Sequence, residues 1–233
     1  MLKINYILEK LIKKYLFINQ KISKKNQEIM LNLNKKDFAP ESLVKKAIKD
    51  PKILNELVEN LVIKDETIRY NSHKVLLIVS EVNPEVLYSK WDFFVNLLKS
   101  KNNFHKVIGL QIIANLTKID REKKFEDIFD IYCDLLDAKS VMTAANLARN
   151  LGKIANAKPN LRSKITNKLL EIEKTSHEPG RKELIKASVI ESFREFFEVS
   201  DNRDLIINFV KKQLNSSSPK TRNTAEKFLK NLS

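Results

Sequence analysis

Apolar residues along most of this chain recur every three or four positions, the spacing that places them on one face of an α-helix. In the stretch 51–64, for example, this spacing links Ile53, Leu54, Leu57, Val58 and Leu61. No stretch alternates polar and apolar residues for long enough to favour a β-strand. The pattern therefore predicts an all-α protein.

The prolines mark where the helices begin. All six precede or open a helical pattern, and proline suits the first helical turn because its missing N–H has no partner to lose there. Asp50, Asn83 and Ser218 precede three of the prolines and are good N-cap residues. The resulting boundaries predict five helix pairs: 51–64 with 66–82, 84–100 with 103–118, 121–138 with 139–155, 159–175 with 179–198, and 201–215 with 219–232.

The second helices of these pairs share a pattern of residue sizes. They align on Arg69, Lys106, Met142, Leu184 and Arg222, with spacings of 37, 36, 42 and 38 residues. Three residues further on, each helix has a small residue: Ser72, Gly109, Ala145, Ala187 and Ala225. Helices need small residues where their backbones press on a neighbour, so these five positions are expected to be buried. A recurring unit of this length is typical of α-solenoids.

Two segments resemble the HEAT-repeat family. Lys-Asp-Glu-Thr-Ile-Arg at 64–69 and Ser-Pro-Lys-Thr-Arg-Asn-Thr-Ala-Glu-Lys-Phe-Leu at 218–229 are similar to the turn and second helix of that repeat. The three middle repeats depart from it, because Lys106, Met142 and Leu184 stand where the family commonly has Arg. The resemblance implies a right-handed α–α superhelix of about five HEAT-like helical pairs over 51–233. Members of such families mostly serve as scaffolds and adaptors, and some bind nucleic acid.

Residues 1–50 do not fit the repeat and are expected to form a basic, helical N-terminal cap or arm. One apolar face is surrounded there by lysines and consists of Ile4, Ile7, Leu8, Leu11, Ile12, Tyr15 and Leu16. A membrane-surface helix and a partner-binding arm remain open as alternatives. Met30 offers an alternative start of the chain, since the helix-rich region begins soon after it.

The composition narrows the possible chemistry. Three glycines and the lack of any Gly-x-Gly exclude a dinucleotide fingerprint and a P-loop, and a lone Cys133 excludes a cysteine zinc cluster. The histidines, His73, His105 and His177, lack metal-ligand spacing. We therefore expect no catalytic residue, no metal and no cofactor. The residual enzymatic alternative is a DNA glycosylase-like activity, for which Trp91-Asp92 gives a weak indication, and core packing of Trp91 is the favoured interpretation.

The location of the protein is predicted from hydropathy. No apolar run approaches the roughly 18 residues that a membrane span needs. Charges break the N-terminal apolar stretch too early for a secretory signal. We therefore expect a cytoplasmic protein without a membrane span, and the oligomeric state is left open.

Charge points to a binding surface. The formal net charge is +14, of which the five second helices contribute +8 and residues 1–50 contribute +7, while the first helices are nearly balanced. Second helices usually line the concave, binding side of a solenoid. The predicted concave strip consists of Arg69, Lys74, Lys106, Gln111, Asn146, Arg149, Asn150, Lys153, Lys227 and Lys230.

The sequence favours a protein partner for this strip, with an acidic or amphipathic segment laid along it. The alternative is a solenoid that grips the phosphate backbone of nucleic acid. Lysine outnumbers arginine and exposed aromatics are few, which weighs against that alternative. An acidic stripe, comprising Glu126, Asp127, Asp130, Asp134 and Asp137, is expected on the opposite, solvated side. A cation site or a pocket for a basic partner is the other interpretation of that stripe.

Overall fold

The structure is a computed structural model that describes residues 33–35 and 37–232. The described part is helical throughout and contains no β-strand. It separates into two compact units, and the first, unit 1, ends at Val79 while the second, unit 2, begins at Ser80, inside helix α4 (Glu66–Val82). The N-terminal face predicted over 4–16 lies outside the described residues, and the predicted domain boundary at residue 50 stays a prediction.

Unit 1 holds the first predicted helix pair. α3 (Pro51–Glu59) continues into the 3₁₀ turn η1 (Asn60–Val62), and α4 follows as the second helix of the pair. The preceding helix α2 (Glu41–Lys49) packs against α3 and buries Leu43, Val44 and Ala47. A part of the region that does not fit the repeat is therefore a helix of this unit.

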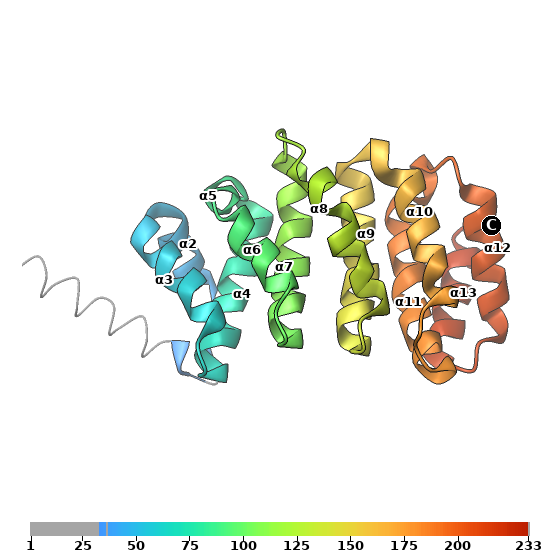
Figure 1. Ribbon diagram of the computed structural model, residues 1–233, viewed down its shortest axis with the longest axis horizontal. Coiled ribbons are helices and arrows are strands. Elements are labelled where there is room, and N and C mark those ends of the chain that lie inside the picture. The colour runs from blue at the N-terminus through green and yellow to red at the C-terminus, as the bar shows by residue number, and fades with distance from the viewer. Residues whose placement is uncertain (1–32, 36, 233) are drawn as a thin grey trace, which may run out of the picture. The chain divides into compact units, whose positions relative to one another are not determined.

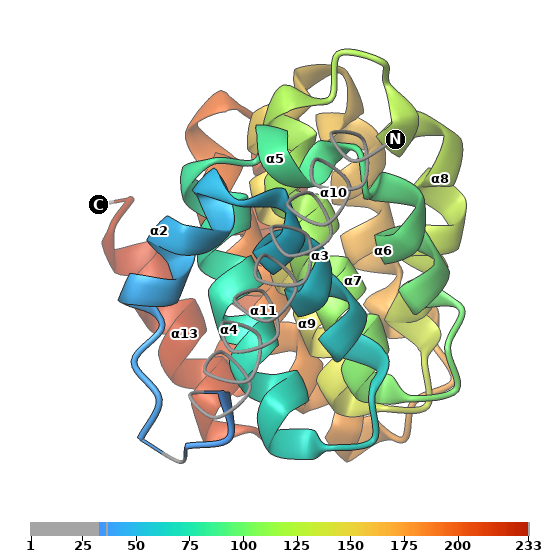
Figure 2. The ribbon, with the colours of Figure 1, turned by 90° about the vertical axis from the view of Figure 1, so that its left-hand side faces the viewer.

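Unit 2 holds the other four pairs, and Figure 1 shows α7, α9 and α11 side by side with α8 and α10 in front of them. The first helices are α6 (Trp91–Leu98), α8 (Lys124–Cys133), α10 (Arg162–Leu170) and α12 (Arg203–Lys212). The second helices are α7 (Asn103–Leu116), α9 (Val141–Ala157), α11 (Pro179–Phe196) and α13 (Pro219–Lys230). Figure 2 shows the same helices after a turn of 90° about the vertical axis. One predicted helix is divided, because α5 (Glu85–Tyr88) and α6 are separated at Ser89 and Lys90.

The predicted helix starts are confirmed at every proline. Pro51, Pro179 and Pro219 open α3, α11 and α13, Pro159 opens η4 (Pro159–Leu161), and Pro40 and Pro84 directly precede α2 and α5. The carboxylate of Asp50 accepts a hydrogen bond from the N–H of Lys52, and the hydroxyl of Ser218 accepts one from Thr221. Asn83 was expected to cap a helix in the same way, but the helix starts one residue later, with Pro84 in the cap position.

The core of unit 2 lies between its two layers of helices. α9 packs on both α7 and α11, and α7 packs on α6. Of the small residues predicted at helix contacts, Ser72, Gly109, Ala187 and Ala225 are buried, whereas Ala145 is half-buried. α9 approaches α11 closely at Gly152, where an added Cβ would lie 2.8 Å from the carbonyl oxygen of Ser192 on α11.

The two HEAT-like segments build the same turn in different units. The guanidinium of Arg69 donates a hydrogen bond to the carbonyl of Ile63, and that of Arg222 donates one to the carbonyl of Ser216. Each acceptor lies six residues before its arginine, at the end of the preceding first helix. These arginines therefore close the turn between two helices of a pair.

Within the described residues, no helix combines the length and the apolar character that a membrane crossing requires.

Candidate functional site

The predicted site residues of unit 2 identify one side of three neighbouring second helices. On α9, Met142, Arg149, Lys153 and Asn156 recur at helical spacing and are all at least partly exposed. Hydrogen bonds from this side reach α7 at Gln111 and Asn115 and reach α11 at Ser188 and Glu191. We call this side of α7, α9 and α11 the second-helix face.

Amide side chains join α7 to α9 on this face. The amide of Gln111 donates to the side-chain oxygen of Asn146 at 3.2 Å. Asn146 and Asn150 in turn donate to the carbonyls of Met142 and Asn146, one turn earlier on α9. The side-chain oxygen of Gln111 is buried without a hydrogen-bond partner among the described residues. Most of the amide groups predicted to contact a partner are therefore engaged within the protein.

Arg149 joins α9 to α11. Its guanidinium lies 3.0 Å from the carboxylate of Glu191 and donates a longer hydrogen bond, 3.3 Å, to the hydroxyl of Ser188. Both members of the ion pair are partly exposed, so solvent screens their attraction. The charge of Arg149 is compensated on the face itself.

Lys153 reaches in the opposite direction, toward α7 and the last turn of α4. Its ammonium donates to the side-chain oxygen of Asn115 at 3.1 Å and forms an ion pair with Glu81 at 3.3 Å. Asn115 is fully buried and donates to the hydroxyl of Ser80. One lysine thus connects three successive second helices, and its charge is also compensated.

Of the other residues of the predicted strip, Lys106 lies on another side of α7. Lys106 is half-buried and precedes Gln111 by five residues, about 140° around the helix. It therefore does not share the side of α7 that carries Gln111. Lys227 and Lys230 are exposed on α13, and their membership of the same surface stays a prediction.

Arg69 and Lys74 belong to unit 1. The side chain of Arg69 is 12% exposed and pairs with Glu66 at 3.7 Å. It also donates the hydrogen bond to Ile63 that closes the turn before α4, so its role is structural. Lys74 is half-buried, with its ammonium 4.6 Å from the centre of the Tyr70 ring.

The acidic stripe on α8 faces lysines of the next first helix. Asp130 pairs with Lys164 at 3.4 Å, and Asp134 lies 4.0 Å from Lys168. Further along, Asp137 accepts hydrogen bonds from the N–H and the hydroxyl of Ser176, and these bonds hold the pKa of its carboxyl below the ordinary value. Asp127, Asp130, Asp134 and Asp137 are exposed as predicted, whereas Glu126 is half-buried and pairs with Lys158 at 3.1 Å.

A buried ion pair sits at the turn before α8. The carboxylate of Asp120 accepts hydrogen bonds from the hydroxyl of Tyr88 at 2.7 Å and from the N–H groups of Lys124 and Phe125, and it pairs with Lys158 at 2.8 Å. Burial raises the pKa of Asp120, but the hydrogen bonds from Lys158 and Tyr88 outweigh burial and lower it. All of these groups are matched, which is typical of a structural cluster.

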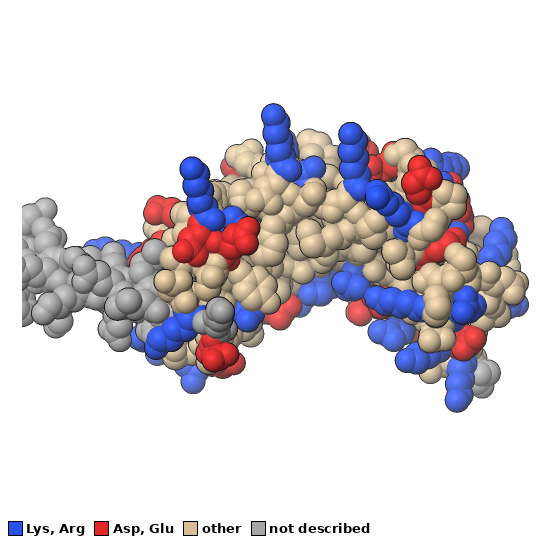
Figure 3. Space-filling view, turned by 90° about the horizontal axis from the view of Figure 1, so that it is seen from below, with Lys and Arg blue, Asp and Glu red and all other residues tan. Residues whose placement is uncertain are grey.

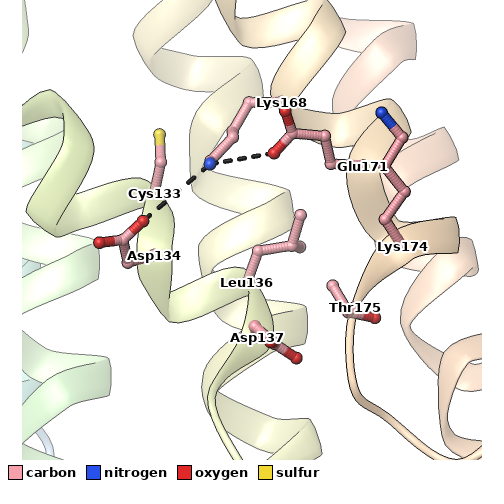
Figure 4. A pocket seen from close by; sticks show the side chains of 8 residues that line it. All are labelled: Cys133, Asp134, Leu136, Asp137, Lys168, Glu171, Lys174 and Thr175. Atoms are coloured by element: carbon pink, nitrogen blue, oxygen red, sulfur yellow. Dashed lines mark ion pairs between the residues drawn. The ribbon is translucent and has the colours of Figure 1, made fainter.

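Figure 4 shows a cavity of about 220 Å³ beside Cys133, between η3 (Asp134–Asp137) and η5 (Glu171–Lys174). Lys168 projects between Asp134 and Glu171 and lies 3.0 Å from Glu171. Burial raises the pKa of the Cys133 thiol to about 12, so the thiol stays protonated and is a poor nucleophile at neutral pH. Lys168 pairs with both Asp134 and Glu171, and Asp137 accepts hydrogen bonds from Ser176.

The remaining candidates for chemistry are packed in the protein interior or in turns. Trp91 is 2% exposed, which confirms its place in the core. A ring nitrogen of His177 lies 2.9 Å from the carbonyl oxygen of Leu136, and one of His105 lies 3.1 Å from the hydroxyl of Ser100. In residues 33–35 and 37–232, no three His, Cys, Asp or Glu side chains are grouped to hold a metal ion.

Comparison with known proteins identifies the fold. No family model and no curated protein matches the chain. Among solved structures, a designed armadillo repeat protein in complex with the peptide (KR)4 superposes with a TM-score of 0.60 at 13% identity, covering 92% of this chain and 94% of that one. An engineered protein solved by the Northeast Structural Genomics Consortium gives a TM-score of 0.55 at 16% identity, covering 88% and 89%. The fold of this chain is therefore an α-solenoid of the HEAT/armadillo-like class.

Proposed function

We propose that this protein is a non-catalytic scaffold or adaptor whose second-helix face binds a segment of a protein partner. The observation that carries the proposal is the alignment of partly exposed side chains from three successive helices, joined by the contacts of Gln111, Arg149 and Lys153. An elongated row of this kind suits an extended segment better than a compact small molecule. A designed protein of the same fold has been solved with a peptide, which supports this use of the fold.

The chemistry of the partner follows from the charges. Arg149 and Lys153 are partly exposed at 47% and 39%, and each has one carboxylate partner that also reaches solvent. An acidic or amphipathic segment can take the place of Glu191 and Glu81 around these two cations, with little cost because exposed ion pairs contribute little to stability. Complementary charge then fixes the register of the segment on the face.

The proposal is tested by selecting peptides from a random display library on the full chain and measuring their affinity by fluorescence anisotropy. We expect acidic or amphipathic peptides, whose binding is lost in the double variant Arg149→Glu and Lys153→Glu. The matched control reverses Lys211 and Lys212, which are exposed on α12. Selected peptides that bind both variants equally well would place the binding site elsewhere.

Binding to nucleic acid is the competing outcome. Labelled duplex and single-stranded oligonucleotides are titrated with the chain at several salt concentrations. Affinity that falls steeply between about 50 and 200 mM salt would indicate phosphate contacts and contradict the peptide proposal. Absence of binding at the lowest salt concentration removes the nucleic-acid alternative.

A further inference from the structure

Exposed apolar side chains lie at one end of the second-helix face. Met142 on α9 and Leu184 on α11 are 46% and 51% exposed. Met142 lies seven residues, about two helical turns, before Arg149, and Leu184 lies seven residues before Glu191. Arg149 and Glu191 form the ion pair between α9 and α11. Met142 and Leu184 therefore occupy matching positions on adjacent helices, at the ends where the helices begin.

The same position on α7 is also apolar. Phe104 is the second residue of α7, as Met142 is of α9. It lies seven residues, about two turns, before Gln111, whose amide contacts α9, so Phe104 is on the same side of α7 as Gln111. Phe104 is half-buried. We call Phe104, Met142 and Leu184 the apolar row. Exposed apolar side chains that gather at equivalent positions favour contact with a partner over isolated solvent exposure.

Basic side chains lie beside the apolar row, and no acidic side chain of the described residues forms an ion pair with them. Three residues before each member of the apolar row stands an exposed basic residue: Lys101, Lys139 and Arg181. None of these three forms an ion pair with a described residue, in contrast to Arg149 and Lys153. The loops at 99–102, 138–140 and 175–178 contain one acidic residue, Glu178. Figure 3 looks at this end of the helices and shows Lys and Arg side chains along it, with scattered carboxylates.

We propose that the apolar row and its basic edge form the docking surface for an extended peptide segment in which acidic residues flank apolar residues spaced three apart. This inference rests on the proposed function. It names the part of the second-helix face that selects the partner segment. The uncompensated cations select carboxylates, and Met142 and Leu184 supply the apolar contact area.

The spacing of the apolar residues follows from helix packing. Adjacent packed helices lie about 8–10 Å apart, so the row presents one apolar side chain at each such interval. An extended polyproline-II segment rises about 3.1 Å per residue and returns to the same side every third residue, or about 9 Å. An apolar residue at every third position therefore matches the row.

The probes are three fluorescein-labelled synthetic peptides of nine residues. The first repeats Glu-Glu-Leu three times. The second has the same composition with its three leucines contiguous, and the third repeats Lys-Lys-Leu. We expect the first peptide to bind the full chain at least about tenfold more tightly than the other two, in line with the loss of about one well-placed apolar contact. Equal binding of the first two peptides overturns the spacing, and preference for the third overturns the charge assignment.

Two double variants test the residues. Met142→Ser with Leu184→Ser should weaken the first peptide at least about tenfold, and Lys139→Glu with Arg181→Glu should abolish its binding. The matched controls are Leu205→Ser, a 47% exposed leucine on α12, and the reversal of Lys211 and Lys212. Both controls should bind within about twofold of the parent chain. Circular dichroism and thermal melts confirm that each variant is folded.

The outcomes separate this inference from the wider proposal. If the first peptide binds, is blocked by Arg149→Glu with Lys153→Glu, and is unaffected by changes to Met142 and Leu184, the docking surface is wrong while the proposed function stands. If none of the three synthetic peptides binds, but library peptides bind in a way that depends on Arg149 and Lys153, the docking surface is again wrong and the proposed function again stands. If neither the synthetic peptides nor any library peptide binds, both proposals are overturned.

Discussion

The contact between α9 and α11 gives the sharpest test of the packing. A methyl group at Gly152 would lie 2.8 Å from the carbonyl oxygen and 3.0 Å from the Cα of Ser192. Both atoms belong to the backbone of a packed helix, so they cannot move aside without displacing α11. We therefore expect Gly152→Ala to destabilise the protein even though alanine is the better helix former.

The magnitude is a difference of two effects. Alanine in place of glycine inside a helix contributes about 1 kcal/mol of helix stability. Overpacking of a closely fitted contact costs about 1–3 kcal/mol. Displacing α11 also lengthens the contact of Arg149 with Glu191, so we expect a net loss of about 1–2 kcal/mol. For a chain of this size, that loss corresponds to a fall in melting temperature of about 2–8 °C.

The chain offers a matched control at Gly180. An added Cβ there meets no atom within 4 Å, and the residue lies in the first turn of α11. Gly180→Ala should leave stability unchanged or raise it by up to about 1 kcal/mol. Circular dichroism during thermal and urea unfolding measures both variants. A Gly152→Ala protein as stable as Gly180→Ala would show that α9 and α11 are less closely packed than described.

Three further predictions concern buried polar groups. Asp120 has a folded-state pKa below its ordinary value of 3.8, so its carboxylate stabilises the fold above about pH 4 and loses this contribution as the pH falls. The variant Asp120→Asn should therefore lose less stability between about pH 5 and pH 3 than the parent chain, as measured by urea titrations. An unchanged pH profile would contradict the assignment. Lys158→Met leaves that carboxylate without its cation and should cost about 3 kcal/mol. Cys133 is buried and its pKa is raised to about 12, so a thiol-specific disulfide reagent at pH 8 should react at the rate of unfolding, and rapid reaction of the native chain would refute this.

The helices could be predicted because their signals are local. Pro51, Pro179 and Pro219 open helices in the structure, and Asp50 and Ser218 cap two of them. Each of these signals acts within one turn of chain, so it does not depend on how helices pack. The division between α5 and α6 was missed because the apolar spacing continues through it.

The site was harder to predict because it depends on how neighbouring helices slide along each other. The sequence alignment pairs Lys106 with Met142, an offset of 36 residues, whereas the contacts between α7 and α9 have offsets of 35, from Gln111 to Asn146, and 38, from Asn115 to Lys153. One residue is about 100° on a helix, so sequence spacing alone does not fix which side chain of α7 lies beside a given residue of α9. The carboxylate of Glu81, 72 residues from Lys153, has no local sequence signal that could identify it as a partner.

The resemblance to the HEAT family and the candidate site involve different residues, for a physical reason. Arg69 and Arg222 each donate to a carbonyl six residues earlier, which a repeat needs wherever a first helix turns into a second. Such residues recur because the fold requires them, and their hydrogen-bond donors are engaged within the turn. A partner contacts groups that reach the surface, and on the second-helix face we propose Met142, Leu184 and the cations beside them for this role. Residues that recur because the fold requires them are therefore poor guides to function, and we expect specificity to depend on the exposed positions between them.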